Sequence, residues 1–267
     1  MMLAAALSLL IGLSLGMLGG GGSILTVPIM VYALGVEERA AMASSLLVVG
    51  TTSLVALVRP VRTGVVAWRT GLVFALAGMT GSFFGGRLSG SIPKSVLLLG
   101  FAMMMLGTGL AMLRKRADSG ELKDMQFGKA LVVGVLTGTL TGLVGAGGGF
   151  VIVPALTLVG GLPMRNAIGT SLLVIALQSF AGFAGHAAHV TVDYPLVGTI
   201  TASASVGAVG GGVLGARISQ EKLRRAFGVF VLVMAVYMGW KQFATQRAGP
   251  PSSATAPSAP TAAPASR

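Results

Sequence analysis

Hydrophobic residues along the chain gather in long runs, which short polar connections separate. Eight runs can be drawn: about 3–34 with a glycine break, 40–58, 68–88, 96–113, 130–159 with a second break, 167–184, 194–216 and 227–240. Most have the length of a helix that crosses a membrane, roughly 20 residues. The pattern predicts an all-α polytopic integral membrane protein with four segments before a polar stretch at 114–129 and four after it.

Composition agrees with a bilayer environment, because 54% of the residues are hydrophobic and only 10% are charged, whereas soluble domains have about 25% charged residues. The net charge of +12 comes from basic residues in short connections. We interpret them as topology determinants and not as contacts to nucleic acid. The chain has no cysteine, which excludes disulfides and thiolate metal sites. We expect a lipid bilayer and a small solute as partners, and a homo-oligomer is left open.

The two halves of the chain repeat one sequence. GMLGGGGSILTVP at 16–28 returns as GLVGAGGGFVIVP at 142–154, and the same spacing pairs Arg39 with Arg165. We expect homologous membrane repeats at 1–113 and 130–247, a charged inter-repeat loop at 114–129, and a disordered Pro/Ala/Ser tail at 248–267. Two repeats that each contain a broken helix are typical of secondary transporters, which bind their solute between the breaks.

The glycine runs at 19–22 and 145–149 interrupt helical sequence, since each glycine costs a helix about 1 kcal/mol relative to alanine. A short helix is expected to restart at Ser23 and at Gly149, and Pro28 and Pro154 should kink or end it. The first amide groups of a restarted helix lack intrahelical partners and favour an anion. The alternative is that these glycines only allow helices to cross closely, as we expect for the GxxxG stripes at 134–142 and 207–215.

Polar side chains near the breaks complete the predicted site. Ser44, Ser45, Thr170 and Ser171 could donate hydroxyl groups to an oxyanion or bond back to their own helices, and the sequence leaves both open. Gln178 is the most polar residue within a span, so it lines the site or bonds to another helix. The predicted substrate-binding residues are Gly19, Gly20, Gly21, Gly22, Ser23, Ser45, Gly145, Gly147, Gly148, Gly149, Ser171 and Gln178.

No predicted span contains a carboxylate. All seven acidic residues fall in connections: Glu37, Glu38, Asp118, Glu121, Asp124, Asp193 and Glu221. Coupling through an intramembrane carboxylate is therefore unsupported. His186 and His189 are the only residues of a type whose intrinsic pKa is near neutrality, but they lie at a helix end, which favours an interfacial role over a proton relay. We expect no metal or cofactor, and the absence of hydrolase motifs disfavours an intramembrane hydrolase.

Loop charges indicate how the broken segments run, either straight across the membrane or back as hairpins. Hairpins would invert the second half and collect basic residues on one side: Arg59, Arg62, Arg69, Arg114, Lys115, Arg116, Lys123, Lys129, Arg165, Arg217, Lys222, Arg224 and Arg225. The other side would hold Arg39, Arg87, Lys94, Lys241, Arg247 and Arg267. Straight crossings divide these charges more evenly. The positive-inside rule thus favours inverted repeats with a cytoplasmic inter-repeat loop and both termini outside.

The paired pattern G-x-x-G-x-G-G-G-x-x-x-V-P followed by A-x-x-T/S-S-L covers both halves and resembles the sulfite exporter TauE/SafE family, also called the toluenesulfonate uptake permease family. The departures are small, since Gly20 and Ser23 stand where the second half has Ala146 and Gly149. The resemblance implies transport of sulfite, sulfonates, sulfoacetate or related organic anions across a bacterial inner membrane. A passive anion channel is the alternative.

Overall fold

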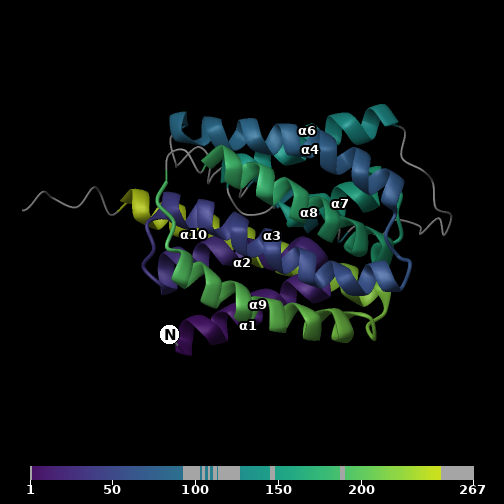
Figure 1. The fold of residues 1–267 in the computed structure, drawn as a ribbon, viewed down its shortest axis with the longest axis horizontal. Helices are drawn as coiled ribbons and strands as arrows, with labels where there is room; N and C mark the ends of the chain where they lie inside the picture. The colour runs from purple at the N-terminus through teal and green to yellow at the C-terminus, as the bar shows by residue number, and fades with distance from the viewer. Residues whose placement is uncertain are drawn as a thin grey trace, which may run out of the picture.

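The computed structural model describes residues 2–92, 127–144, 148–186 and 190–247, with six isolated positions between 103 and 113. Every regular element within these ranges is helical (Figure 1). The elements are α1 (Met2–Leu18), η1 (Gly19–Gly22), α2 (Ser23–Pro28), η2 (Ile29–Ala33), α3 (Glu38–Arg62), α4 (Trp68–Leu88), η3 (Ser89–Ser91), α6 (Phe127–Val144), α7 (Gly149–Pro154), η4 (Ala155–Val159), α8 (Met164–His186), α9 (Tyr194–Gly215) and α10 (Gln220–Arg247).

The predicted apolar runs coincide with these helices, except the run at 96–113, which lies mostly outside the described residues. The helix α10 begins at Gln220, well before the predicted run at 227–240, because its first turns are charged and hydrophobicity marks only the membrane part. Three described helices are long and apolar enough to cross a membrane: Arg39–Arg62 within α3, α8 and α9. Shorter apolar helices include Gly128–Leu143.

Capping side chains fix two helix starts. The Asp193 carboxylate accepts a hydrogen bond from the Leu196 N–H at 3.1 Å, one turn into α9. Glu37 accepts from the Ala40 N–H at 3.3 Å at the start of α3. Each cap satisfies an amide that the first helical turn leaves without a backbone partner.

Helices α1, α3 and α9 run in one direction. Gly12 of α1 packs against Ala204 of α9, and Gly16 packs against Ala208, so both residue numbers rise together. Ala41 and Val48 of α3 share a buried cluster with Val197, Ile200 and Ala204 of α9. Arg59, near the end of α3, contacts Gly212 near the end of α9. These three helices are therefore parallel.

Helices α4, α6 and α8 run the opposite way. Contacts between α4 and its two neighbours rise together in residue number: Phe74 with Gly134, Ser82 with Gly142, Gly71 with Thr170, and Gly86 with Gly182. The crossing of α3 with α8 has the reverse order, since Gly50 lies against Ser179 and Pro60 against Gly169. The helix pairs α1 and α6, α3 and α8, and α4 and α9 are therefore antiparallel.

Both glycine-broken segments fold back as hairpins. Because α1 and α3 are parallel, the chain between them must return to the end of the bundle where α1 begins, and α2 with η2 makes this return (Figure 1). Because α6 and α8 are parallel, α7 with η4 makes the equivalent return. We call the segments 2–33 and 127–159 the first and second hairpins. The structure thus has the hairpins that the loop charges favour, not straight crossings.

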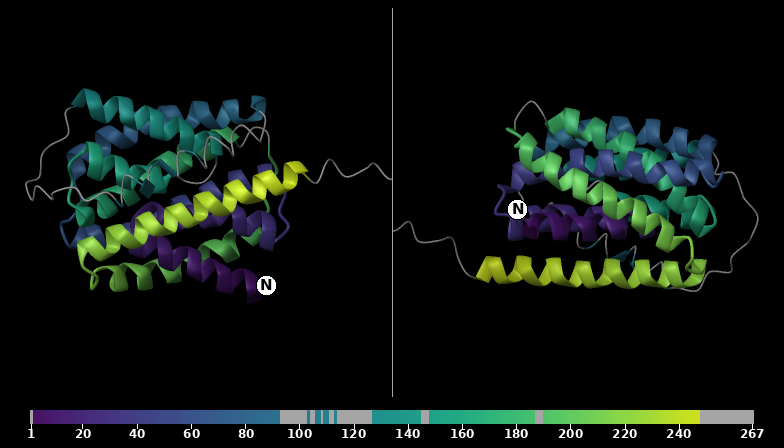
Figure 2. Two further views of the ribbon diagram at one scale, coloured as in Figure 1. Left: turned by 180° about the vertical axis from the view of Figure 1, so that it is seen from behind. Right: turned by 60° about the horizontal axis from the view of Figure 1, so that its bottom comes forward.

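Helices α3 and α8 form the centre of the bundle. In each of these two helices, 72% of the most apolar 18-residue stretch is buried, whereas in α9 only 33% of that stretch is buried. The helix α10 lies across one side of the bundle (Figure 2) and packs on the hairpins, with Leu223 and Val231 in one cluster with Ile24 and Val151. The inner ends of the hairpins therefore lie between α8 and α10, whereas α1 and α6 each have an exposed face.

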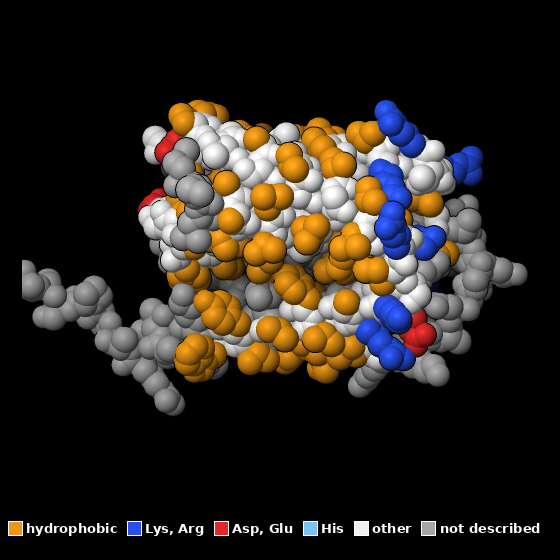
Figure 3. Space-filling view, turned by 90° about the horizontal axis from the view of Figure 1, so that it is seen from below, with side chains coloured by type: hydrophobic (Ala, Val, Ile, Leu, Met, Phe, Trp, Pro, Cys, Tyr) orange, Lys and Arg blue, Asp and Glu red, His pale blue; other side chains and the backbone are white. Residues whose placement is uncertain are grey.

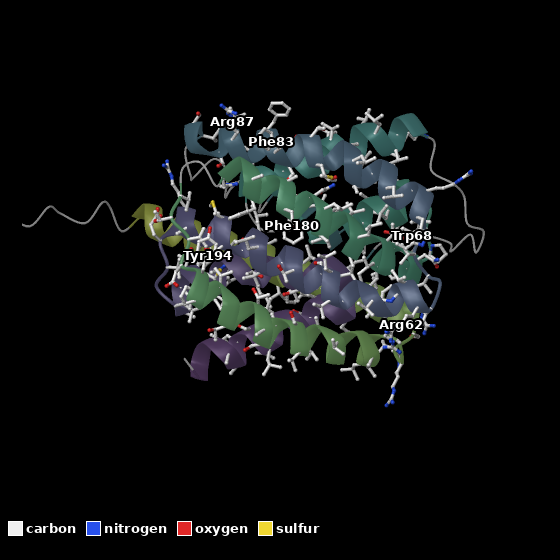
Figure 4. The ribbon with its side chains drawn as sticks, viewed as in Figure 1. Arg62, Trp68, Phe83, Arg87, Phe180 and Tyr194 are labelled. Atoms are coloured by element: carbon white, nitrogen blue, oxygen red, sulfur yellow. The ribbon has the colours of Figure 1, made fainter. Side chains whose placement is uncertain are left out.

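Basic residues gather at one end of the bundle, which we call the basic end (Figure 3). It carries Arg62 and the start of α4 at Trp68, whereas Arg87 and Tyr194 mark the opposite end (Figure 4). The helix directions place these described basic residues at the basic end: Arg59, Arg62, Arg69, Lys129, Arg165, Arg217, Lys222 and Arg225. Arg39 and Arg87 lie at the opposite end, with Glu37 and Asp193.

The predicted packing role of the glycine stripes is confirmed. A Cβ on Gly138 would lie 2.0 Å from the Gly78 carbonyl oxygen, and one on Gly211 would lie 2.1 Å from that of Leu13. No side chain fits between these backbones. The stripes hold α6 against α4 and α9 against α1, as small residues do where lipid supplies no drive for association.

Candidate functional site

The glycines break each hairpin at its tip through left-handed backbone. Gly19 has a φ of +68° and opens a 3-10 turn, after which α2 restarts at Ser23. Gly148 has a φ of +57° and directly precedes α7, which restarts at Gly149. An L side chain is strained at such φ values, whereas glycine is not. Both predicted restart positions are confirmed.

The two prolines end α-helical hydrogen bonding at the same place in both hairpins. Helix α2 ends at Pro28 and α7 at Pro154, and each continues as a π-helix. In the first hairpin the Leu34 N–H donates to the Ile29 carbonyl at 3.1 Å; in the second the Gly160 N–H donates to that of Ala155 at 3.0 Å. The predicted change at the prolines is confirmed, and its form is a switch to i→i+5 bonding. Such π-turns are frequent at functional sites.

The tips of the two hairpins touch in the interior. A Cβ on Gly20 would lie 1.9 Å from both the Cα and the carbonyl carbon of Gly149. A Cβ on Gly149 would lie 2.1 Å from the Gly20 Cα and 2.6 Å from the Ile175 side chain on α8. The two backbones therefore meet directly, with α8 beside them.

Ser171 lies beside the first tip, although it belongs to the second half of the chain. A Cβ on Gly19 would lie 2.8 Å from the Ser171 hydroxyl oxygen. The Ser171 hydroxyl donates to the Ile168 carbonyl at 2.8 Å. In the same way, the Ser45 hydroxyl donates to the Met42 carbonyl at 2.8 Å, and the Ser23 hydroxyl donates to the Gly20 carbonyl at 2.6 Å. Each of the three hydroxyl groups therefore donates its proton within its own segment.

The structure brings only part of the predicted site together. Gly19, Gly20, Gly149 and Ser171 converge at the tips, and Gly21 and Gly22 complete the 3-10 turn there. Gly145 and Gly147 lie outside the described residues. The Gln178 side chain lies against Gly78 of α4, about 10 Å along α8 from Ser171 and one helical turn from Ile175, which contacts Gly149.

Several buried polar atoms lack a hydrogen-bond partner within the described part of the chain. Both side-chain amide atoms of Gln178 are among them, although its side chain has no exposed surface. The others are hydroxyl groups of Thr26, Thr52, Ser53 and Ser179. Buried polar groups are nearly always paired with protein, water or ligand. Thr26 lies on α2, and the other four residues lie on α3 and α8; we call these five residues the polar strip.

Sequence reasoning missed Thr26, Thr52, Ser53 and Ser179 as candidates. The signal was available for three of them, because Thr52 and Ser53 stand at the repeat spacing from Gln178 and Ser179. Small hydroxyl residues are common in membrane helices and usually bond back to the backbone. Only the coordinates distinguish a serine that does so from one that does not.

His186 is buried at the end of α8, with 5% of its surface exposed. Its Nδ1 lies 3.0 Å from the Gly182 carbonyl oxygen and its Nε2 lies 3.1 Å from the Ser89 hydroxyl of η3. The residue therefore ties α8 to the end of α4. His189 lies outside the described residues.

A cavity of about 170 Å³ lies between the basic end and the first tip. Gly16 and Met17 of α1 and Ile168 of α8 line its inner part, and Ile168 also contacts Gly19. Arg59 and Arg165 line its outer part. The cavity, and not a packed core, therefore lies between the first tip and the basic surface.

Acidic side chains are absent from the described lining of both the tips and the cavity. The described residues also hold no group of three or more His, Cys, Asp or Glu side chains that could bind a metal ion. The chemistry available at the tips is therefore backbone amides and serine hydroxyls, which suits the binding of an anion.

Known proteins with similar sequences are membrane transporters. A probable membrane transporter protein of Xylella fastidiosa is 37% identical over 248 residues, covering 88% of this chain and 94% of that protein. The probable membrane transporter protein YdhB of Bacillus subtilis is 26% identical over 225 residues, covering 82% of this chain and 90% of that protein. No solved structure matches the chain.

The sequence profile of the sulfite exporter TauE/SafE family matches residues 4–238, which include α3, α4, α6, α8 and α9 in full and most of α1 and α10. The resemblance carried by the glycine motifs is thereby confirmed. A transporter family also leaves no place for the intramembrane hydrolase alternative. The chain is a multi-pass membrane protein that belongs to the sulfite exporter TauE/SafE family of transporters.

Proposed function

We propose that the protein is a secondary transporter of small anions, of the sulfur-containing class that includes sulfite, sulfonates and sulfoacetate, in a bacterial inner membrane. The family name supports a sulfur oxyanion, and similar proteins from Xylella fastidiosa and Bacillus subtilis support a bacterial membrane. The observation that carries the proposal is the contact between Gly20 and Gly149, which joins two broken helices in the interior.

The substrate site lies at the hairpin tips. Helical backbone restarts there at Ser23 and at Gly149 and continues through the π-turns, so each tip starts a helical run of eleven residues. Because the Ser23 amide already donates to the Gly20 carbonyl, the donors to an oxyanion come from the earlier amides of the 3-10 turn Gly19–Gly22 and from the first amide of α7 at Gly149. The hydroxyls of Ser45 and Ser171 add donors once each turns away from its carbonyl partner on its own helix. The unpaired atoms of the polar strip support a hydrated interior beside the tips. Anion binding needs no buried lysine or arginine under this arrangement.

Alternating access follows from two inverted repeats, 1–113 and 130–247. The antiparallel course of α1 and α6, α3 and α8, and α4 and α9 supports this inversion. Each hairpin packs on a long helix of the other half, α1 on α9 and α6 on α4. Rocking of these two pairs about the α3–α8 crossing would open the tips to one end of the bundle and then the other.

The basic end faces the cytoplasm in this proposal. Its arginines and lysines outnumber those of the opposite end among the described residues (Figure 3), and basic loops stay cytoplasmic. Both ends of the described chain, α1 and α10, then start or finish at the outer face (Figure 1). The cavity below the first tip opens to the cytoplasmic side.

Counterflow in liposomes tests the function. Purified protein loaded with unlabelled sulfite or a sulfonate should accumulate the labelled anion transiently against its gradient. A passive anion channel, which the lack of described carboxylates in the spans also fits, dissipates the gradient without counterflow. Equal uptake in protein-free liposomes would reject both functions.

The Ser171→Ala variant tests the site. Because Ser171 lies beside Gly19, its loss should raise the KM for the anion several-fold. The control is Ser14→Ala, since the Ser14 hydroxyl donates within its own helix to Leu10 at 2.8 Å and lies away from the tips. An unchanged KM in Ser171→Ala would remove Ser171 from the site.

A further inference from the structure

Two arginines from different halves of the chain face the same helix end at the basic-end cavity. Arg59, near the end of α3, donates to the Gly212 carbonyl oxygen of α9. Arg165, at the start of α8, donates to the Ala216 carbonyl oxygen at 2.9 Å. Gly212 lies in the last turn of α9 and Ala216 is its C-cap residue, and both arginines line the cavity. The end of α9 thus holds two guanidinium groups at the cavity mouth.

These bonds do not exhaust the guanidinium groups. A guanidinium presents several N–H donors in a fixed planar fork, and a bond to one carbonyl uses one of them. No acidic residue is among those that line the cavity. The described acidic residue on the neighbouring stretch of α10, Glu221, is paired with Arg225 at 2.6 Å. Positive charge at the mouth is therefore left for an outside anion.

The remaining wall of the cavity is apolar. Met17, Ile168, Leu172 and Leu223 come from three different helices and lie inward of the arginines. Leu172 and Leu223 are 1% and 2% exposed, so the wall is part of the packed core. At about 170 Å³ the cavity is well above the room that one water needs. It can hold a small organic molecule with a hydrocarbon part.

We propose that this cavity binds an organic anion with a short hydrocarbon chain, whose sulfonate or carboxylate lies on Arg59 and Arg165 and whose chain lies on Ile168, Leu172 and Leu223. The inference rests on the proposed transport function, for which the cavity is the cytoplasmic vestibule. It selects amphiphilic anions such as alkanesulfonates over bare sulfite or sulfate. The site is distinct from the tips, because it uses arginines and an apolar wall.

Binding to the detergent-purified full chain tests the proposal by isothermal titration calorimetry with sulfate, methanesulfonate and 1-butanesulfonate. Affinity should rise by about fourfold for each methylene that the apolar wall buries. Arg59→Gln and Arg165→Gln should each weaken butanesulfonate binding by about tenfold or more, as loss of a charged hydrogen bond does. Arg62→Gln is the matched control, since Arg62 lies exposed on the same helix end outside the cavity.

A second variant separates the apolar wall from the charge. Leu223→Ala should weaken butanesulfonate binding and leave methanesulfonate binding unchanged, because only the longer chain reaches Leu223. Equal affinities for sulfate and butanesulfonate, or an equal loss in Arg62→Gln, would overturn the proposal. Elution as a single species on size-exclusion chromatography, with the melting temperature of the wild type, shows that each variant is folded.

Anionic lipid is the other source of a charged head with a hydrocarbon chain. Butanesulfonate should bind with the same affinity in phosphatidylcholine nanodiscs with and without phosphatidylglycerol. If phosphatidylglycerol weakened butanesulfonate binding, and Arg59→Gln abolished that competition, the proposal would be overturned. Binding measured without a gradient also separates the cavity proposal from the transport proposal. Intact binding with no counterflow rejects the transport function alone, whereas counterflow without arginine-dependent binding rejects this cavity alone.

Discussion

Gly20→Ala puts one methyl group between the hairpin tips. The new Cβ would lie 1.9 Å from the Cα and carbonyl carbon of Gly149, and 2.1 Å from its carbonyl oxygen. Ordinary van der Waals contact begins at 3.4 Å, so the two backbones must separate by about 1.5 Å. Gly20 does not have a positive φ. Alanine is therefore compatible with the local backbone, and the substitution reports the contact alone.

The expected loss of stability is about 3 kcal/mol, the upper end of the usual cost of overpacking, because both sides of the contact are backbone and no side chain can turn away. For a domain of this size that corresponds to a fall of about 10 °C in the melting temperature. Transport should fall by at least about tenfold, since separated tips cannot present both sets of amides to one anion.

Gly198→Ala is the matched control for this variant. Gly198 lies in α9, and a Cβ there would meet nothing within 4 Å. Alanine should stabilise that helix by up to about 1 kcal/mol and leave transport unchanged. The two measurements are the thermal melt in detergent and counterflow in liposomes. A Gly20→Ala protein with the melting temperature and flux of the wild type would refute the direct contact between the tips.

Further outcomes follow from other contacts. Gly138→Ala should lower the unfolding free energy by about 2 kcal/mol, because the new Cβ would lie 2.0 Å from the Gly78 carbonyl oxygen. Gly78→Ala should cost less, because its Cβ meets the movable end of the Gln178 side chain. Urea or SDS titration measures both losses, and a larger loss in Gly78→Ala would contradict the packing argument. Gln178→Leu should raise the melting temperature by about 2–4 °C, since it removes two buried unpaired amide atoms, and should lower the counterflow rate; a fall in melting temperature would show that the amide is paired. Because the chain has no cysteine, Thr63→Cys and Thr191→Cys can be labelled on whole cells with an impermeant maleimide, and only the second should react; reaction at Thr63→Cys would place the basic end outside.

Local features of the hairpins could be predicted from the sequence because glycine and proline act on the residues next to them. The glycine runs fix where helical bonding fails, so the restarts at Ser23 and Gly149 follow from residue type alone. Pro28 and Pro154 likewise mark where α-helical bonding ends. The change to π-helical bonding was not predictable, because it depends on how the chain re-enters the packed bundle and no residue type encodes it.

Helix partners could not be predicted from the stripes of small residues. The stripe at Gly138 shows that a backbone can approach closely, but any other small stripe would suit it. The structure pairs α6 with α4 and α1 with α9, and these choices depend on the hairpin geometry. Polarity alone predicts Gln178 as a site residue, and its packing against Gly78 of α4 depends on the tertiary fold. Arg59 and Arg165 were interpreted only as topology signals, because their meeting at α9 depends on the tertiary fold.

The central claim is that two re-entrant hairpins meet tip to tip and hold the transported anion beside that contact. A cryo-electron microscopy map of the full chain in nanodiscs with a bound sulfonate tests it most directly. The account predicts broken backbone at Gly19 and Gly148, contact between the two tips, and anion density within hydrogen-bond distance of Ser171. Continuous helices through 16–28 and 142–154, or tips separated by lipid, would contradict it.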